Sequence, residues 1–155
     1  MTVTDEDVDR LVEAMDLGRA RWISGHGDFA EGAAFRQAED MTIFAPFGGS
    51  SPRPGDLSPE ALAAAQAATS AQFHGGEGSC EVVRTIVEGD LVVLVMIERS
   101  TVMFEGRDAP HPWILRTTQI FRRADDQQWV RLHRHADPLI LRRPLDVTLG
   151  LLEDA

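Results

Sequence analysis

The second half of the chain constrains the fold most, because from Cys80 onward the sequence reads as successive β-strands. The strand-like segments are rich in β-branched and aromatic residues, and they cover residues 80–88, 91–104, 113–123 and 129–137. Short turn-forming sequences separate them, namely Gly89-Asp90, Gly106-Arg107-Asp108 and Asp125-Asp126. Strands joined by such short connections pair antiparallel with their neighbours. The pattern therefore predicts an antiparallel meander.

The first half of the chain has helical patterns instead. Thr4 followed by Asp7 resembles a capping box. The apolar residues that come next are spaced as on one face of a helix, at Val8, Leu11, Val12 and Met15. This pattern predicts a helix to about residues 22–23 that ends at Ser24-Gly25. Ser58-Pro59-Glu60 is a second helix start, and it predicts an alanine-rich helix to about Phe73.

The segments between these elements carry weaker signals. Asp28 can cap a short helix through Phe29 and Phe35, and residues 41–44 are a short strand candidate. Residues 48–56 and 74–79 are rich in loop-forming residues, and they predict an exposed loop and a break between elements. Helices that precede a meander indicate the α+β class rather than alternating βαβ units. We expect residues 1–155 to form a single domain with an apolar tail over residues 138–155.

Composition argues against several kinds of chemistry. All fifteen basic residues are arginine. There is therefore no lysine for a Schiff base, a pyridoxal phosphate linkage or a Walker-type phosphate loop. The sequence contains no tyrosine to act as a proton donor. The formal net charge of −10 disfavours nucleic acid and anionic membranes as partners, because binding to phosphates depends on cationic side chains.

The expected location is the cytoplasm. No segment approaches the roughly 18 consecutive apolar residues of a membrane helix. The acidic residues 1–7 lack the basic-then-apolar order of a signal peptide. The single cysteine, Cys80, cannot form an internal disulfide, which fits a reducing compartment.

Several motifs along the chain occur in an order that points to one superfamily. They are Trp22 followed by Gly27-Asp28, the segment 40–49 (DMTIFAPFGG), residues 115–118 with Phe121-Arg122-Arg123, and the segment 129–137 (WVRLHRHAD). This order resembles the NTF2-like superfamily, specifically its SnoaL-like or ketosteroid-isomerase-like bacterial branch. The resemblance covers about residues 5–137. It implies a cone, in which a curved antiparallel sheet wraps around N-terminal helices and leaves an apolar pocket for a small molecule.

The resemblance also implies a homodimer, but it does not determine an activity. Members of the superfamily include isomerases, dehydratases, cyclases, epoxide hydrolases and proteins that only bind or assemble. Steroid isomerases place their aspartate base before a Pro-X-Gly turn, whereas Ala45 precedes the turn Pro46-Phe47-Gly48 here. Their oxyanion hole needs a tyrosine and a protonated acid, and this chain has Gln119 about where that acid would lie. Enolising isomerase chemistry of that type is not expected, and neither is tyrosine-dependent dehydration.

Two catalytic arrangements stay open. One is a carboxylate–arginine set of Glu98, Arg116 and Asp137, similar to the trio that activates water in proteins like limonene-epoxide hydrolase. The other is an acid–base pair of His135 and Asp137 in the style of polyketide cyclases, because histidine exchanges protons near neutral pH. Either set would perform proton transfer or water addition without an organic cofactor. A non-catalytic ligand-binding or homodimeric assembly module is the alternative.

The last strand of the meander determines which of these groups reach the pocket. Regular alternation puts Trp129, Arg131, His133, His135 and Asp137 on one face, and Val130, Leu132, Arg134 and Ala136 on the other. The resemblance implies that Leu132, Arg134 and Ala136 face the cavity, which leaves the histidines outside at a dimer interface. A β-bulge would reverse this assignment.

A metal site is the less favoured interpretation of the same histidines. Two histidines on one strand face can bind zinc, with a further ligand from Glu98 or His111. No cysteine cluster supports such a site, so no metal is predicted.

The predicted pocket lining combines aromatic side chains with a few polar ones. The expected ligand-binding residues are Trp22, Phe44, Phe47, Met96, Trp113, Gln119, Leu132 and Arg134. Glu98 interrupts an apolar strand, and an ionisable group in such a place needs a partner. We expect that partner to be Arg116 or Arg134.

Overall fold

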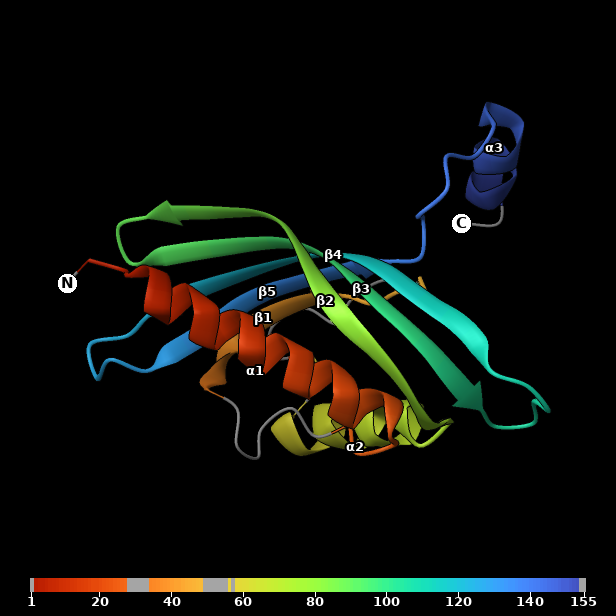
Figure 1. Cartoon of the computed structure of the whole chain (residues 1–155), viewed down its shortest axis with the longest axis horizontal. Helices are drawn as coiled ribbons and strands as arrows, with labels where there is room; N and C mark the ends of the chain where they lie inside the picture. The colour runs from red at the N-terminus through yellow and green to blue at the C-terminus, as the bar shows by residue number, and fades with distance from the viewer. Residues whose placement is uncertain (1, 28–33, 49–55, 57, 154–155) are drawn as a thin grey trace.

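The computed structural model describes residues 2–27, 34–48, 56 and 58–153. The elements are α1 (Asp5–Ile23), β1 (Phe35–Phe44), α2 (Pro59–Ser70), β2 (Phe73–Glu88), β3 (Leu91–Phe104), β4 (His111–Arg123), β5 (Trp129–Asp137) and α3 (Leu145–Glu153). Figure 1 shows a curved sheet with α1 along one side and α2 below one end. The predicted α+β class is confirmed.

Helix α1 begins and ends where the sequence predicts. The Thr4 hydroxyl accepts a hydrogen bond from the Asp7 N–H (3.2 Å), and the Asp7 carboxylate accepts one from the Thr4 N–H (2.9 Å). These bonds, together with the nearby Arg123 guanidinium, hold the pKa of Asp7 below its ordinary value. The residues that α1 buries recur every four positions: Asp7, Leu11, Met15, Arg19 and Ile23. This periodicity gives the helix one face that packs into the sheet.

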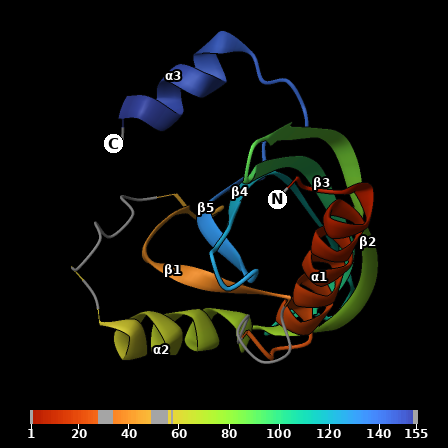
Figure 2. The same ribbon diagram turned by 90° about the vertical axis from the view of Figure 1, so that its left-hand side faces the viewer.

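The strands form one sheet in the order β1-β5-β4-β3-β2. Strands β2 to β5 pair antiparallel with their neighbours in the chain, which confirms the predicted meander. Strand β1 pairs parallel with β5, so the described sheet is mixed rather than purely antiparallel as predicted. The added strand covers backbone groups at an edge of the meander that would otherwise lack partners. In Figure 2 the sheet curls around α1 without closing, which forms the expected cone.

Three local predictions are wrong. Phe35 begins β1 instead of belonging to a short helix, and the rest of that predicted helix, residues 28–33, lies outside the described residues. The ring of Phe35 packs edge-on against Phe121 (centroids 5.2 Å apart), and its burial in the core favours a strand at this position. The predicted break at residues 74–79 is part of β2, and α2 ends at Ser70 rather than Phe73.

Strand β5 contains a β-bulge at Leu132. Its neighbours pair with consecutive residues of β4, because His133 lies opposite Ile120 and Arg131 lies opposite Phe121. Leu132 is the extra residue, and it shifts the alternation of the strand by one. As a result Arg131 and Arg134 both point toward the concave side, where they line the same cavity.

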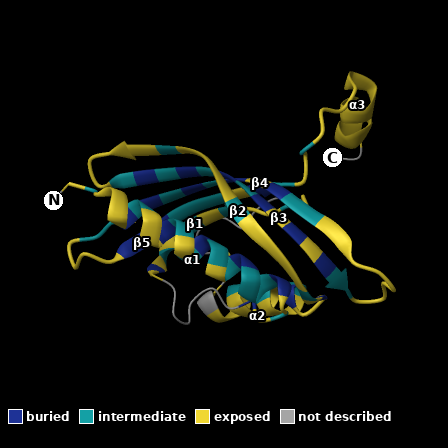
Figure 3. Cartoon of the chain, in the orientation of Figure 1, coloured by how far each residue is buried: buried dark blue, intermediate teal, exposed yellow. Residues whose placement is uncertain are grey.

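The tail differs from the rest of the chain in its exposure. Figure 3 shows α3 away from the sheet and exposed along its whole length. Leu145, at 72% exposure, is the most exposed apolar residue of the helix. No helix among the described residues is long and apolar enough to cross a membrane.

Candidate functional site

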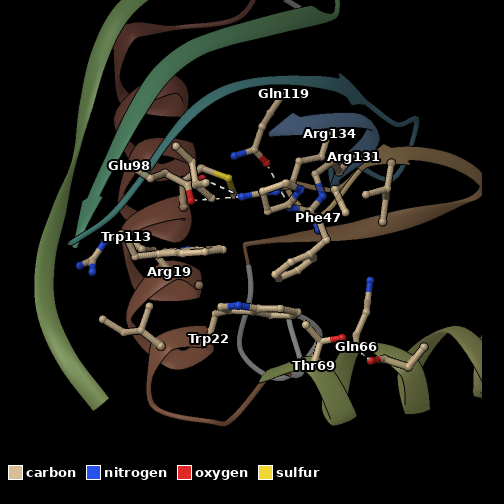
Figure 4. Close-up of a pocket in the computed structure, with 18 of the residues that line it drawn as sticks. Arg19, Trp22, Phe47, Gln66, Thr69, Glu98, Trp113, Gln119, Arg131 and Arg134 are labelled. Carbon is tan, nitrogen blue, oxygen red and sulfur yellow. Dashed lines mark hydrogen bonds and ion pairs between the residues drawn. The ribbon is translucent and has the colours of Figure 1, made fainter. Parts of the chain in front are cut away.

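A cavity of about 280 Å³ opens between the concave face of the sheet, the second half of α1 and helix α2. Side chains from α1, α2, the end of β1 and strands β3 to β5 line it (Figure 4). Its volume is just below the range of typical small-molecule pockets, roughly 300–1,000 Å³. The cavity therefore fits a small ligand.

Aromatic rings form much of the wall. Trp113 stacks on Phe47 with ring centroids 5.7 Å apart, and it meets Phe73 edge-on at 5.2 Å. Trp22 from α1 also packs against Phe73, at 6.0 Å. Such offset and edge-to-face contacts fix ring positions, so this wall is preformed.

Polar groups gather on the sheet side of the cavity. The Arg134 guanidinium donates hydrogen bonds to both carboxylate oxygens of Glu98, at 3.1 Å each. The Arg131 guanidinium donates to the Gln119 carbonyl oxygen at 3.0 Å. Glu98 is 7% exposed and Gln119 is 1% exposed. Figure 4 shows the two interactions next to each other, above the aromatic rings.

The sheet register explains why these four residues meet. Gln119 of β4 lies opposite Arg134 of β5, so the two share the concave face. Glu98 belongs to the buried row of β3, in which alternate residues from Val92 to Val102 point inward. The bulge at Leu132 adds Arg131 to this face.

Arg131 lies in an unusual electrostatic environment. Its side chain is 1% exposed, and its guanidinium lies over the Phe35 ring, 4.9 Å from the centroid. Burial lowers the pKa of Arg131 to about 9, and the nearby charge of Arg134 adds to this effect. A buried guanidinium favours a partner that carries negative charge.

A third arginine reaches the cavity from α1. The Arg19 guanidinium donates hydrogen bonds to the Asp16 carboxylate (3.0 Å), the Ser100 hydroxyl (3.1 Å) and the Gly78 carbonyl (2.8 Å). These contacts tie the helix to strands β2 and β3 and fix the position of the guanidinium.

The structure places half of the sequence-predicted site residues in the cavity lining. These are Glu98, Trp22, Phe47, Trp113, Gln119 and Arg134. The partner of Glu98 is Arg134, one of the two expected candidates. Met96 is buried in the core cluster with Leu11 and Met15 and is not part of the lining. Leu132 is the bulge residue and is also outside the lining, contrary to its expected orientation.

The other predicted residues form a separate cluster on the opposite face of the sheet. Arg116 donates two hydrogen bonds to Asp137 (2.9 and 3.0 Å), and the His135 Nε2 lies 3.7 Å from the same carboxylate. The ring of Phe44 lies edge-on to His135 at 5.6 Å. The structure thus does not bring Glu98, Arg116 and Asp137 together as a trio.

The electrostatics of this outer cluster are those of a solvated ion pair. Burial opposes ionisation of Asp137, but hydrogen bonds from Arg116 and from the Leu139 N–H hold its pKa below the ordinary value. Partial burial and the neighbouring His135 lower the pKa of His133, whose Nδ1 lies 2.7 Å from the Thr42 hydroxyl. Among the described residues, no group of three His, Cys, Asp or Glu side chains is placed to hold a metal ion.

Several residues of the lining are not among those predicted from the sequence. Arg19, Arg131, Gln66 and Thr69 all belong to it. The signal for Arg19 was present, because it lies between Met15 and Ile23 on the apolar face of α1, where a charge needs a partner. No comparable signal exists for Arg131, since its orientation depends on the bulge.

Cys80 of β2 lies opposite Glu98 in the sheet. Burial raises the pKa of its thiol to about 12, and the charge of Glu98 contributes to the increase. Because the thiolate is the nucleophilic form, the raised pKa leaves this cysteine unreactive at neutral pH.

These features define the class of protein: an α+β cone whose curved sheet borders a cavity lined by aromatic and charged side chains. Comparison with solved structures shows that the chain has the NTF2-like fold. An NTF2-like family protein from Streptomyces avermitilis, provisionally named a dehydratase, has a TM-score of 0.68 at 16% identity. The match covers 90% of this chain and 100% of that one.

Other matches have different activities in their names. A ketosteroid isomerase-like protein from Erwinia carotovora atroseptica has a TM-score of 0.64 at 10% identity, over 89% of this chain and 100% of that one. The association domain of C. elegans CaMKII has a TM-score of 0.56 at 11% identity, over 85% and 93% of the two chains. No protein-family model and no curated protein sequence matches the chain. At such low identities the comparisons establish the fold alone.

Proposed function

We propose that the chain is a SnoaL-like protein that binds a small, mostly apolar molecule in its cone-shaped pocket. We further propose that it carries out proton transfer or water addition on that molecule without an organic cofactor. The observation that supports this most is Glu98, a buried carboxylate beside an aromatic-walled cavity of about 280 Å³.

Glu98 is the best candidate for the acid–base group. A carboxylate can accept a proton from a ligand or from water and return it later in the reaction. The paired hydrogen bonds from Arg134 fix its orientation toward the lining. His135 and Asp137 lack this position, because their cluster is on the other face of the sheet. Within this proposal, Arg134 is a positioning residue and Gln119 and Arg131 orient the ligand.

Native mass spectrometry of the purified protein is the first test, because it detects any co-purified molecule together with the mass of the oligomer. The released molecule is then incubated with the protein in D₂O and in H₂¹⁸O. We expect Glu98→Gln to retain the molecule but to slow isotope incorporation by about 10²–10⁴-fold, the usual contribution of a general acid or base. Asp137→Asn on the outer face serves as the matched control.

Two results would contradict the proposal. Equal incorporation rates in the Glu98→Gln variant and the unmodified protein would remove Glu98 from the chemistry. Binding without any incorporation would favour the non-catalytic ligand-binding alternative.

A second candidate function is homodimeric assembly, and the exposed helix α3 is the observation that favours it. The helix presents Leu145, Val147, Leu149, Leu151 and Leu152, all exposed by 45% or more. The outer face of the sheet adds Phe44, which is 52% exposed and lies beside His133 and His135. Apolar surface of this kind is usually covered by a partner. The CaMKII hub and association domains with this fold give independent support for assembly.

We expect truncation after Pro138 to convert a dimer into a monomer, because it removes the apolar helix. Light scattering coupled to size-exclusion chromatography would measure the change in mass. Asp146→Asn, which alters a polar residue of α3 in the full chain, should leave the mass unchanged. An unaltered mass after truncation would contradict a role of the tail in assembly.

A further inference from the structure

The pocket contains an excess of positive charge. Among the described residues, the charged groups of the lining are those of Arg19, Arg131, Arg134 and Glu98, so three guanidinium groups face one carboxylate. This excess occurs in a chain with a formal net charge of −10. Arg19 also pairs with Asp16, but the Asp16 side chain is 47% exposed and does not line the cavity. Positive charge is therefore concentrated in the pocket, although the chain as a whole is acidic.

Two of the three arginines, Arg131 and Arg134, lie next to each other on strand β5 at the sheet side of the cavity. Arg131 and Arg134 lie close enough for the charge of Arg134 to lower the pKa of Arg131, and the charge of Glu98 offsets only part of the decrease. In Figure 4 their side chains lie together between Gln119 and the ring of Phe47. Burial excludes water from Arg131, whose side chain is 1% exposed, so electrostatic attraction is strong here. An anionic group bound beside them would relieve the repulsion between the two guanidinium groups.

We propose that the ligand of the pocket is an amphipathic organic acid. Its apolar part lies among Trp22, Phe47 and Trp113, and its anionic group points toward Arg131 and Arg134. A guanidinium group matches a carboxylate because it offers parallel N–H donors. This inference rests on the proposed function, since it specifies the class of molecule that occupies the same pocket.

The test compares isosteric acids and amides. Benzoate, 3-phenylpropionate and 2-naphthoate are titrated alongside their neutral amides, with isothermal calorimetry and quenching of tryptophan fluorescence as readouts. Trp22 and Trp113 line the cavity and report on occupancy. We expect the best acid to bind at least about tenfold more tightly than its amide, because hydrogen bonds to charged groups are worth that much or more.

Two pocket variants should change this acid-to-amide ratio in opposite directions. Arg131→Met removes one guanidinium while retaining volume, and we expect the ratio to fall to about three or less. Glu98→Gln removes the competing carboxylate and releases Arg134, and we expect the ratio to rise several-fold. Arg99→Gln is the control for Arg131→Met, because Arg99 is an exposed residue of β3 and its loss changes the net charge by the same amount and in the same direction. Opposite shifts cannot result from general unfolding.

The outcomes separate this inference from the proposed function. Acids and amides that bind equally well would overturn the anionic ligand while leaving an apolar pocket in place. The same ratio in Arg131→Met, Glu98→Gln and the unmodified protein would also overturn it. No binding by any of the six compounds would contradict the proposed function together with the inference.

Discussion

Replacing Arg134 with methionine should lower the free energy of unfolding by about 3–5 kcal/mol, the usual effect of removing one partner from a buried ion pair. The Arg134 and Glu98 side chains are only 14% and 9% exposed, and they are joined by two hydrogen bonds of 3.1 Å. Methionine approximately fills the volume of arginine, so the loss arises from the Glu98 charge rather than from a cavity. Denaturation in urea, followed by circular dichroism, measures the change.

An exposed ion pair that also includes a residue of β3, the strand of Glu98, provides the control. Arg99 of β3 pairs with Glu81 of β2 at 3.2 Å, but both side chains are about half exposed. Arg99→Met should therefore cost no more than about 1 kcal/mol. The double variant Glu98→Met/Arg134→Met should recover most of the stability, because it removes both charges. If Arg134→Met costs no more than Arg99→Met, Glu98 is better solvated than its burial indicates.

The order of elements was predictable because local signals agree with the tertiary structure. The capping box at Thr4 and Asp7 is present, and the helix ends at Ile23 with Ser24 as its C-cap. The four strand patterns after Cys80, separated by three turn sequences, correspond to β2 through β5. The phenylalanine at position 35 shows the limit of such signals, because its strand pairs with residues almost a hundred positions later. Contacts of that range are invisible to a local pattern.

The site was less predictable, for reasons that involve single residues. A β-bulge leaves no consistent mark in a strand sequence, so regular alternation assigned Arg131 to the outer face. The structure turns Arg131 inward, and it becomes one of the most buried side chains of the chain. Arg134 and Ala136 keep the orientation implied by the resemblance. They lie after the bulge, where they pair with Gln119 and Thr117 of β4. The positive charge of the pocket was underestimated from the sequence. Arg131 had been assigned to the outer face of the sheet, and Arg19 had not been singled out.

The glycines of β2 explain why a predicted break is a strand, and they lead to the second large prediction. Gly78 lies opposite Ser100 of β3, and a Cβ atom at Gly78 would lie 2.0 Å from the Arg99 carbonyl oxygen. Gly76 has the same relation to the Thr101 carbonyl oxygen, at 2.1 Å. Glycine here therefore permits a close approach of the two strands rather than a turn.

We expect Gly78→Ala to lower the free energy of unfolding by about 3 kcal/mol, at the upper end of the cost of overpacking, because backbone must move. The same displacement would carry away the Gly78 carbonyl that accepts a hydrogen bond from Arg19, so ligand affinity should fall as well.

Gly150→Ala in α3 is the control. A Cβ atom there meets no other atom within 4 Å, and alanine favours a helix, so stability should stay level or rise. Equal stability of the Gly78→Ala variant and the unmodified protein would mean that β2 and β3 can separate at this point without cost. In that case the curvature that encloses the pocket would have to depend on the bulge at Leu132 and on α1 rather than on the glycines of β2.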